Sequence, residues 1–135
     1  SNTYGADDSD QNVQVTGSSN TFTLNQATTA LADSLNLDWI IQGSNNTITS
    51  TINIDNATNY MDIDGSDNTL TYVGTGVTAS AGGYFYLDHT GGSRTFNIQQ
   101  LSTQDNDWLK ILSTSGTSAS TVCVIQNDQG TSTSC

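Results

Sequence analysis

The fold is decided by the stretch Leu37-Asp-Trp-Ile-Ile-Gln-Gly43-Ser-Asn-Asn46-Thr47-Ile-Thr49, which recurs as Tyr60-Met-Asp-Ile-Asp-Gly65-Ser-Asp-Asn68-Thr69-Leu-Thr71. Each copy joins two alternating apolar and polar segments through Gly-Ser-x-Asn, and the two glycines stand 22 residues apart. A third copy occupies residues 13 to 24, with Gly17 and Asn20 in the same places. Self-similarity at such a period is typical of solenoids and arrays, so the sequence predicts one structural unit stacked several times.

The apolar residues recur at fixed offsets from the turn glycine, two and four before it and five after it. Side chains of period two that return to the same place in each copy stack about 4.8 Å apart and form one inward file. The sequence therefore predicts an all-β, single-domain parallel β-solenoid of about five coils, each of 22 to 26 residues. Its predicted core residues are Val13, Val15, Phe22, Leu24, Trp39, Ile41, Ile48, Met61, Ile63, Leu70, Leu87, Phe96 and Ile98.

The last two coils are degenerate. The fourth aligns when Gly91 takes the place of the turn glycine, and the fifth has one strand around Trp108 and another around Val122, joined by a turn from Ser113 to Ser118. Atypical terminal repeats are common where a stack must be capped. We therefore expect an acidic flexible arm over residues 1–11, solenoid repeats over 12–126 and a C-terminal tail over 127–135.

Two cysteines, Cys123 and Cys135, lie near the C-terminal end. Such a pair in a small polar chain predicts a disulfide that ties the tail back, which would contribute about 3 kcal/mol under the chain-entropy model. The alternative is one buried thiol and one exposed terminal thiol.

The charge excludes some partners. The chain has 13 aspartates against Arg94 and Lys110, a net charge of −11, so it repels phosphate backbones and anionic lipid surfaces. We expect no nucleic-acid binding. No apolar run approaches the roughly 18 residues that a membrane-spanning helix needs, and proline, which breaks sheet ladders, is absent. The chain opens at Ser1 as a processed secreted protein does, so we expect a secreted protein or one at a virion surface.

The repeated turn residues have a physical interpretation. Gly17, Gly43, Gly65 and Gly91 would supply a positive φ at each corner. The asparagines three residues on, Asn20, Asn46 and Asn68, tolerate the left-handed region and bond locally to the backbone. Stacked asparagines would also form an amide ladder. The simpler alternative is that all of these are turn residues and nothing more.

The pattern apolar-x-apolar-x-Gly-x-x-Asn, with Gln nine residues after the Gly, resembles the curlin-type repeat of curli, the secreted bacterial amyloid fibres. The first coil carries Gly17, Asn20 and Gln26, whereas Ile52 and Gly74 stand at the second Gln position in the next two coils. Val15, Ile41 and Ile63 stand where the family has its first Gln. The resemblance implies a secreted, self-associating β-solenoid.

The first functional hypothesis is a structural subunit that polymerises head to tail with copies of itself. A solenoid leaves an unpaired strand edge at each end, and soluble monomers blunt such edges with charge, Pro or a covering helix. A head-to-tail contact that does not close on itself produces a filament.

Two alternatives remain open. Outward Thr-x-Thr files, formed by Thr21, Thr23, Thr47, Thr49, Thr69, Thr71 and Thr95, resemble the ice-binding faces of β-solenoid antifreeze proteins. Threonine is equally favoured on any exposed strand, which would leave these files as ordinary surface. A virion decoration or adhesin module is the other alternative, with Trp39, Tyr84, Tyr86 and Trp108 as contacts if exposed; otherwise they cover the core.

The sequence offers no enzyme site. His89 has Asp88 beside it and Ser93 nearby, but no nucleophile-elbow motif surrounds Ser93. The pairs Asp62/Asp64 and Asp105/Asp107 fall on the solvated side of their strands. These acids and Asp67 could hold Ca²⁺, although a solvated acidic turn is the alternative and no EF-hand or β-roll motif is present. We expect no cofactor.

Overall fold

The computed structural model describes residues 10–26, 34–53, 56–76, 83–102, 108–114 and 120–127. In these ranges the chain forms strands and turns, and no helix is long and apolar enough to cross a membrane. The strands are β1 (Asp10–Thr16), β2 (Thr21–Gln26), β3 (Asn36–Gln42), β4 (Thr47–Asn53), β5 (Thr58–Asp64), β6 (Asn68–Gly76), β7 (Tyr84–Thr90), β8 (Arg94–Ser102), β9 (Trp108–Thr114) and β10 (Thr121–Asn127).

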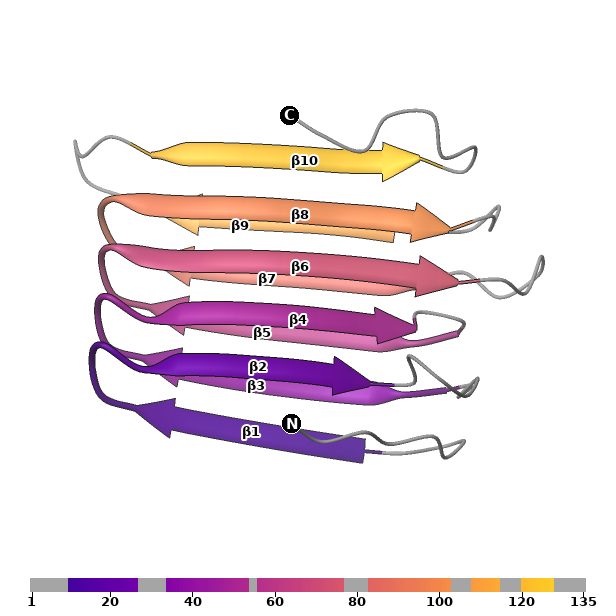
Figure 1. The fold of residues 1–135 in the computed structure, drawn as a ribbon, viewed down its shortest axis with the longest axis horizontal. Coiled ribbons are helices and arrows are strands. Elements are labelled where there is room, and N and C mark those ends of the chain that lie inside the picture. The colour runs from indigo at the N-terminus through magenta and orange to yellow at the C-terminus, as the bar shows by residue number, and fades with distance from the viewer. Residues whose placement is uncertain are drawn as a thin grey trace.

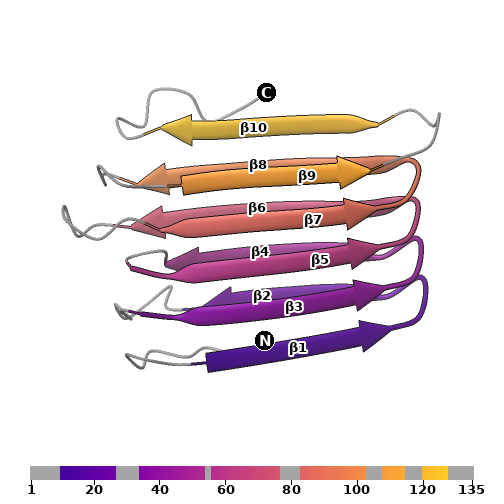
Figure 2. The same cartoon turned by 180° about the vertical axis from the view of Figure 1, so that it is seen from behind.

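The strands alternate between two parallel sheets. Odd-numbered strands form one sheet in the order β1-β3-β5-β7-β9, and even-numbered strands form the other in the order β2-β4-β6-β8-β10. Each coil contributes one strand to each sheet, and the chain rises as a right-handed coil (Figures 1 and 2). This is the hand that nearly all crossovers between parallel neighbours adopt. The predicted all-β parallel solenoid is confirmed.

Register is kept although coil length varies. Asp10 pairs with Asn36, Asn36 with Thr58, Thr58 with Tyr84 and Tyr84 with Trp108, which sets these coils at 26, 22, 26 and 24 residues. These lengths lie within the predicted range. Because the side-chain period is two, the constant register keeps every inward position inward.

The core fills the space between the two sheets. Ten predicted core residues are buried: Leu24, Trp39, Ile41, Ile48, Met61, Ile63, Leu70, Leu87, Phe96 and Ile98. Val13 and Phe22 are partly buried and pack against this core, and Val15 is half-buried. They belong to the first coil, and the described chain places no further rung beneath them. Rings also interleave across the core, where Tyr72 stacks on Phe85 with centroids 4.0 Å apart.

Three predicted boundaries need correction. The C-terminal tail was placed at residues 127–135, but Asn127 still pairs with Leu101 in β10. The N-terminal arm was placed at residues 1–11, but Asp10 and Gln11 already pair with β3. Ser113 was expected in the last turn, yet it lies in β9, where it pairs with His89. The strand continues through Thr114 because both residues extend the parallel ladder with β7, Ser113 opposite His89 and Thr114 opposite Thr90. The remainder of the arm, residues 1–9, and the tail beyond Asn127 lie outside the described residues.

Candidate functional site: the corners and the open ends

Each corner between an odd and an even strand begins at a glycine with positive φ. The angles are 137° at Gly17, 135° at Gly43, 136° at Gly65 and 151° at Gly91, a region that L side chains rarely adopt. These predicted turn glycines therefore have the predicted conformation.

The left-handed residue of the corner is not the predicted one. It lies two residues after the glycine, at Ser19, Asn45, Asp67 and Ser93, and not at the asparagine three residues on. Small polar residues fill the position because their short side chains tolerate positive φ. The asparagines three residues after the glycine, Asn20, Asn46 and Asn68, have a different role.

That role is to bond one coil to the next. The Asn46 side-chain oxygen accepts from the Asn20 backbone N–H at 3.0 Å and from the Asn20 side-chain amide at 3.2 Å. The Asn68 oxygen accepts from the Asn46 backbone N–H at 2.9 Å. The amide ladder thus joins side chain to side chain between Asn20 and Asn46, whereas the next rung is bonded through the backbone. Asn46 and Asn68 are buried, so these bonds are shielded from water.

Sequence reasoning missed a second ladder, made of serines one place after the glycine. The Ser18 hydroxyl oxygen accepts from the Ser44 backbone N–H at 3.1 Å, and the Ser44 oxygen accepts from the Ser66 N–H at 3.1 Å. The Ser66 oxygen accepts from the Gly92 N–H at 3.0 Å. The recurrence of Gly-Ser in three copies was the signal that could have revealed this ladder.

The glycines themselves are stacked in contact. A Cβ added at Gly43 would lie 2.1 Å from the Gly17 carbonyl oxygen, and one at Gly65 would lie 2.2 Å from the Gly43 oxygen. Gly91 meets Gly65 in the same way. A Cβ at Gly17 would have only the Asn20 amide nitrogen nearby, at 3.3 Å. Gly17 is therefore the one turn glycine that lacks a lower neighbour within the described chain.

The two ends of the solenoid are offset by half a coil. At the N-terminal end β1 stands alone beyond the level of β2 and β3, and at the other end β10 stands alone beyond β8 and β9 (Figures 1 and 2). β1 belongs to the odd sheet and β10 to the even sheet. Across the described ranges, no strand pairs with the outer edges of β1, β2, β9 or β10.

The inward side chains of the end strands are partly open. Val122 is in register with buried Phe96 and Val124 with buried Ile98, yet they are 46% and 43% exposed. Val13 and Val15 at the other end are half-buried. Apolar core positions are thus exposed at both ends.

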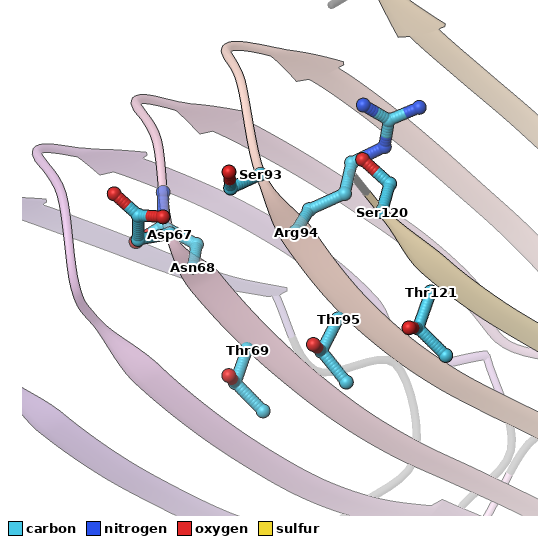
Figure 3. A pocket seen from close by; sticks show the side chains of 8 residues that line it. All are labelled: Asp67, Asn68, Thr69, Ser93, Arg94, Thr95, Ser120 and Thr121. Atoms are coloured by element: carbon cyan, nitrogen blue, oxygen red, sulfur yellow. The ribbon is translucent and has the colours of Figure 1, made fainter. Parts of the chain in front are cut away.

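The outer face of the even sheet carries the predicted threonine files. Thr21, Thr47, Thr69, Thr95 and Thr121 are in register along all five of its strands, and Figure 3 shows the last three in a row. The second file runs through Thr23, Thr49 and Thr71 and then passes to Asn97. The register brings together every threonine that was predicted to share this face.

Arg94 interrupts the asparagine column. It pairs with Asn68 and lines a groove of about 260 Å³, where its guanidinium lies beside Ser120 and away from Asp67 (Figure 3). Its Nε and Nη1 atoms are buried and have no hydrogen-bond partner among the described residues. Guanidinium donors suit an oxyanion, but Asp67 in the same groove and the net charge of −11 oppose one.

The outer face of the odd sheet carries aromatic residues. Tyr84 is 51% exposed and Trp108 is 43% exposed, whereas Trp39 is buried in the core. Tyr86 is partly exposed, and the Lys110 ammonium lies over its ring, 4.7 Å from the centroid. Of the four aromatics named as contacts, only Trp39 is thus removed from any surface role.

His89 and Ser93 do not meet. His89 is fully buried, its Nε2 lies 3.2 Å from the Gly65 carbonyl oxygen, and its Nδ1 lies 3.0 Å from the Ser113 hydroxyl. A carbonyl only accepts, so Nε2 carries the hydrogen and Nδ1 accepts from Ser113. Burial lowers the pKa of the His89 imidazole. The ring edge packs on Phe96, which makes His89 a core residue.

The paired acids lie on the outer face of the odd sheet. Burial and neighbouring Asp64, Asp88 and Asp38 raise the pKa of the Asp62 carboxyl. Asp62 stacks on Asp88 in register, so carboxylates repel along the sheet. Among the described residues, no group of three or more His, Cys or acidic side chains is placed to hold a metal ion. Asp105 and Asp107 lie outside those residues.

The predicted disulfide can be placed at one end only. Cys123 lies in β10 in register with Asn97. Cys135 is outside the described residues, so the bridge stays a prediction.

Comparison with known proteins gives no relative. No protein-family model matches the chain, and neither a curated protein nor a solved structure is similar to it. The fold and its ends define the class as a right-handed parallel β-solenoid with half-coil offset ends.

Proposed function

We propose that this protein is a structural subunit that joins head to tail with copies of itself into an extracellular or virion-surface filament. The observation that carries the proposal is the half-coil offset of the two ends. Among the described residues, β1 has no opposite strand at one end and β10 has none at the other. The two ends are therefore complementary, since each supplies the strand that the other lacks.

In the proposed joint, β1 of one copy adds to β9 of the preceding copy and β2 adds to β10. Continuing the register of the odd sheet stacks Val13 on Ile111 and Thr16 on Thr114. Continuing the even sheet stacks Thr21 on Thr121 and Phe22 on Val122. Apolar side chains that are half-exposed in one molecule would be buried at the joint, and burial contributes about 25 cal/mol per Å².

Charge also supports this joint. Lys110 lies on the outer face of the last odd strand, and Asp10 lies on the outer face of the first. The continued register stacks Asn12 of the following copy on Lys110 and Asp10 on Trp108, so Lys110 and Asp10 are diagonal neighbours two residues apart along the strands. Directly opposite charges contribute about 0.2–1 kcal/mol, and this diagonal pair contributes less, so it supports contact between the two ends without fixing the register. The resemblance to curlin-type repeats points to the same class of assembly.

The test places one lysine on the inward side of the joint strand β10 and one on its outward side. Val122→Lys puts a charge on an inward position that is half-exposed in the single molecule but buried at the joint, so we expect loss of filaments. Thr121→Lys is the matched control, since it makes the same charge change on the adjacent outward position. Negative-stain microscopy and light scattering over a concentration series provide the measurement, with circular dichroism to verify folding.

Three outcomes decide the matter. Filaments from wild type and Thr121→Lys but single particles from folded Val122→Lys support the proposal. A wild-type protein that stays monomeric at high concentration contradicts it. Equal assembly of both variants contradicts the joint described here.

The threonine face favours a second candidate function, ice binding. The observation in its favour is the in-register file of five threonines on a regular sheet. Thermal hysteresis in wild type that disappears in Thr47→Tyr would support it. Hysteresis that is absent from wild type, or unchanged in Thr47→Tyr, would leave the file as ordinary strand surface.

A further inference from the structure

The outer face of the odd sheet holds a groove that lies on the side of the solenoid and reaches the last odd strand, β9. It has a volume of about 470 Å³, within the range of small-molecule sites, and is lined by Thr58, Tyr60, Tyr84, Tyr86, Trp108 and Lys110. Buried Asn59 of β5 also lines the groove, and the six outward residues come from β5, β7 and β9, two from each strand. They form two columns along the coil axis, about 6.7 Å apart because the two members on each strand are two residues apart.

One column presents open rings. Tyr84 and Trp108 lie with centroids 5.8 Å apart and tilted by 46°, and both are among the most exposed large side chains described. In the other column Tyr60 and Tyr86 have centroids 5.1 Å apart. Lys110 already covers one face of Tyr86, which leaves the Tyr84 and Trp108 rings as the main platform.

The charges around the groove disfavour charged ligands. A cation on the platform would lie near Lys110, which is part of the groove wall. An anion would meet a chain of net charge −11, with Asp62 and Asp88 two residues further along the strands from Tyr60 and Tyr86. The site therefore favours a neutral ligand, and its aromatic platform favours one with a flat, apolar C–H face.

Polar groups stand at the edge of the platform. The Thr58 hydroxyl, the phenolic hydroxyl of Tyr60 and the Lys110 ammonium can exchange hydrogen bonds with a hydroxylated ligand. Burial, followed by the charge of Asp62, raises the pKa of the Tyr60 phenol, so this hydroxyl keeps its hydrogen at neutral pH. Apolar ring faces beside neutral donors are the chemistry that pyranose rings require, since a sugar offers C–H groups on one face and hydroxyls around its rim.

We propose that this groove binds a neutral oligosaccharide, with one pyranose ring stacked on Tyr84 and Trp108 and its hydroxyls bonded by Lys110 and Tyr60. Trp108 and Lys110 lie on β9, the strand that would receive β1 of a following copy, so sugar binding has to be tested apart from the joint. Binding is therefore measured on the Val122→Lys variant in the absence of filaments.

Trp108 serves as the reporter. The chain has two tryptophans, and Trp39 is buried, so quenching by acrylamide reports mainly on Trp108. Neutral cellohexaose, maltohexaose and chitohexaose are titrated, and calorimetry verifies each affinity. At least one is expected to protect Trp108 and to saturate below about 10 mM. The cationic deacetylated form of chitohexaose and an anionic guluronate hexamer are expected to bind at least about tenfold more weakly.

Variants locate the site. Tyr84→Ala and Trp108→Ala, the latter measured by calorimetry, are each expected to weaken binding about tenfold. Leu112→Ala is the matched control, because Leu112 is an exposed large side chain on β9 outside the groove. The proposal is overturned if no neutral oligosaccharide binds, if a charged oligomer binds as well, or if Leu112→Ala weakens binding as much as Trp108→Ala. Loss of self-association in Trp108→Ala without loss of sugar binding would show a contact between copies and overturn this role for the platform.

Discussion

A single residue, Arg94, ends the asparagine column. Asn46 and Asn68 each offer an oxygen to the backbone N–H one coil below, but a guanidinium has no acceptor to offer Asn68. The substitution therefore breaks the column and also buries two nitrogens that have no partner among the described residues. Burying such donors costs about 1–3 kcal/mol each.

Replacing Arg94 by Asn should repair the column. We expect Arg94→Asn to raise the free energy of unfolding by about 1–2 kcal/mol, because it adds an acceptor above Asn68 and removes two buried donors that have no partner in the described part of the chain. Urea denaturation measures the change. Arg94→Ala is the control, since it removes the donors without adding an acceptor, and its gain should be smaller. A destabilised Arg94→Asn would contradict this account of the column.

His89 predicts a pH dependence. Its folded pKa lies below the usual 6.5, so the unfolded chain binds more protons as the pH falls below that value. As the pH falls from 6.5 to the lowered folded pKa, the free energy of unfolding should therefore decrease. Above pH 6.5, His89 should not affect it. In His89→Gln, whose amide donates and accepts without titrating, the slope in this window should vanish. A persistent slope would assign it to other groups.

The corner is the element that sets the repeat. Its glycines stack so closely that a Cβ at Gly65 would enter the Gly43 carbonyl, whereas a Cβ at Gly17 would not meet backbone. A side chain at any of the four corners would therefore cost backbone strain. At Gly43, Gly65 and Gly91 it would also clash with the glycine of the preceding coil.

Gly65→Ala and Gly17→Ala separate the two costs. Gly17→Ala should lose about 1–3 kcal/mol of unfolding free energy from its positive φ alone. Gly65→Ala adds the clash and should lose clearly more, enough to prevent folding. Thermal unfolding followed by circular dichroism compares the two. Equal losses would show that strain alone sets the cost.

The structural features that could be predicted are those that depend only on spacing along the chain. Alternation with a constant offset from glycine predicts strands, inward side and register, because all three depend on spacing along the chain. The left-handed residue was misassigned because Ser19, Asn45 and Asp67 vary while the asparagine beside them does not. Val13 and Phe22 are only half-buried because they lie in the end coil. Their residue types match those at the same positions of inner coils, so the sequence does not reveal this.

The aromatic groove was equally hard to foresee. Tyr84 and Trp108 stand 24 residues apart, and only the register of β7 and β9 brings their rings together. Tyr84, Tyr86 and Trp108 were named as contacts if exposed, together with Trp39, which is inward. Alternation along the strands distinguishes the inward from the outward aromatic residues. Trp39 lies an even number of residues, four, before its turn glycine and points inward, whereas Tyr84 lies an odd number, seven, before Gly91 and points outward.

At the scale of the whole molecule, the C-terminal tail is expected to be covalently tied to the last coil. The prediction concerns Cys123 and Cys135. Alkylation of the denatured, unreduced protein should modify neither cysteine, and alkylation after reduction should modify both, as mass spectrometry can show. Reduction should lower the unfolding free energy by about 3 kcal/mol. Two modified thiols before reduction would establish the alternative of unpaired cysteines.

The unequal coil lengths have a consequence for engineering and for evolution. The glycine corners of the first four coils span only the few residues between Thr16 and Thr21, Gln42 and Thr47, Asp64 and Asn68, and Thr90 and Arg94. The connections on the opposite edge range from the short one between Asn53 and Thr58 to the long one between Gln26 and Asn36. The edge with the glycine corners thus keeps a nearly constant connection length, whereas the opposite edge accommodates connections of different lengths. Foreign peptides inserted along the opposite edge would be carried at regular intervals without disturbing the pairing of the strands.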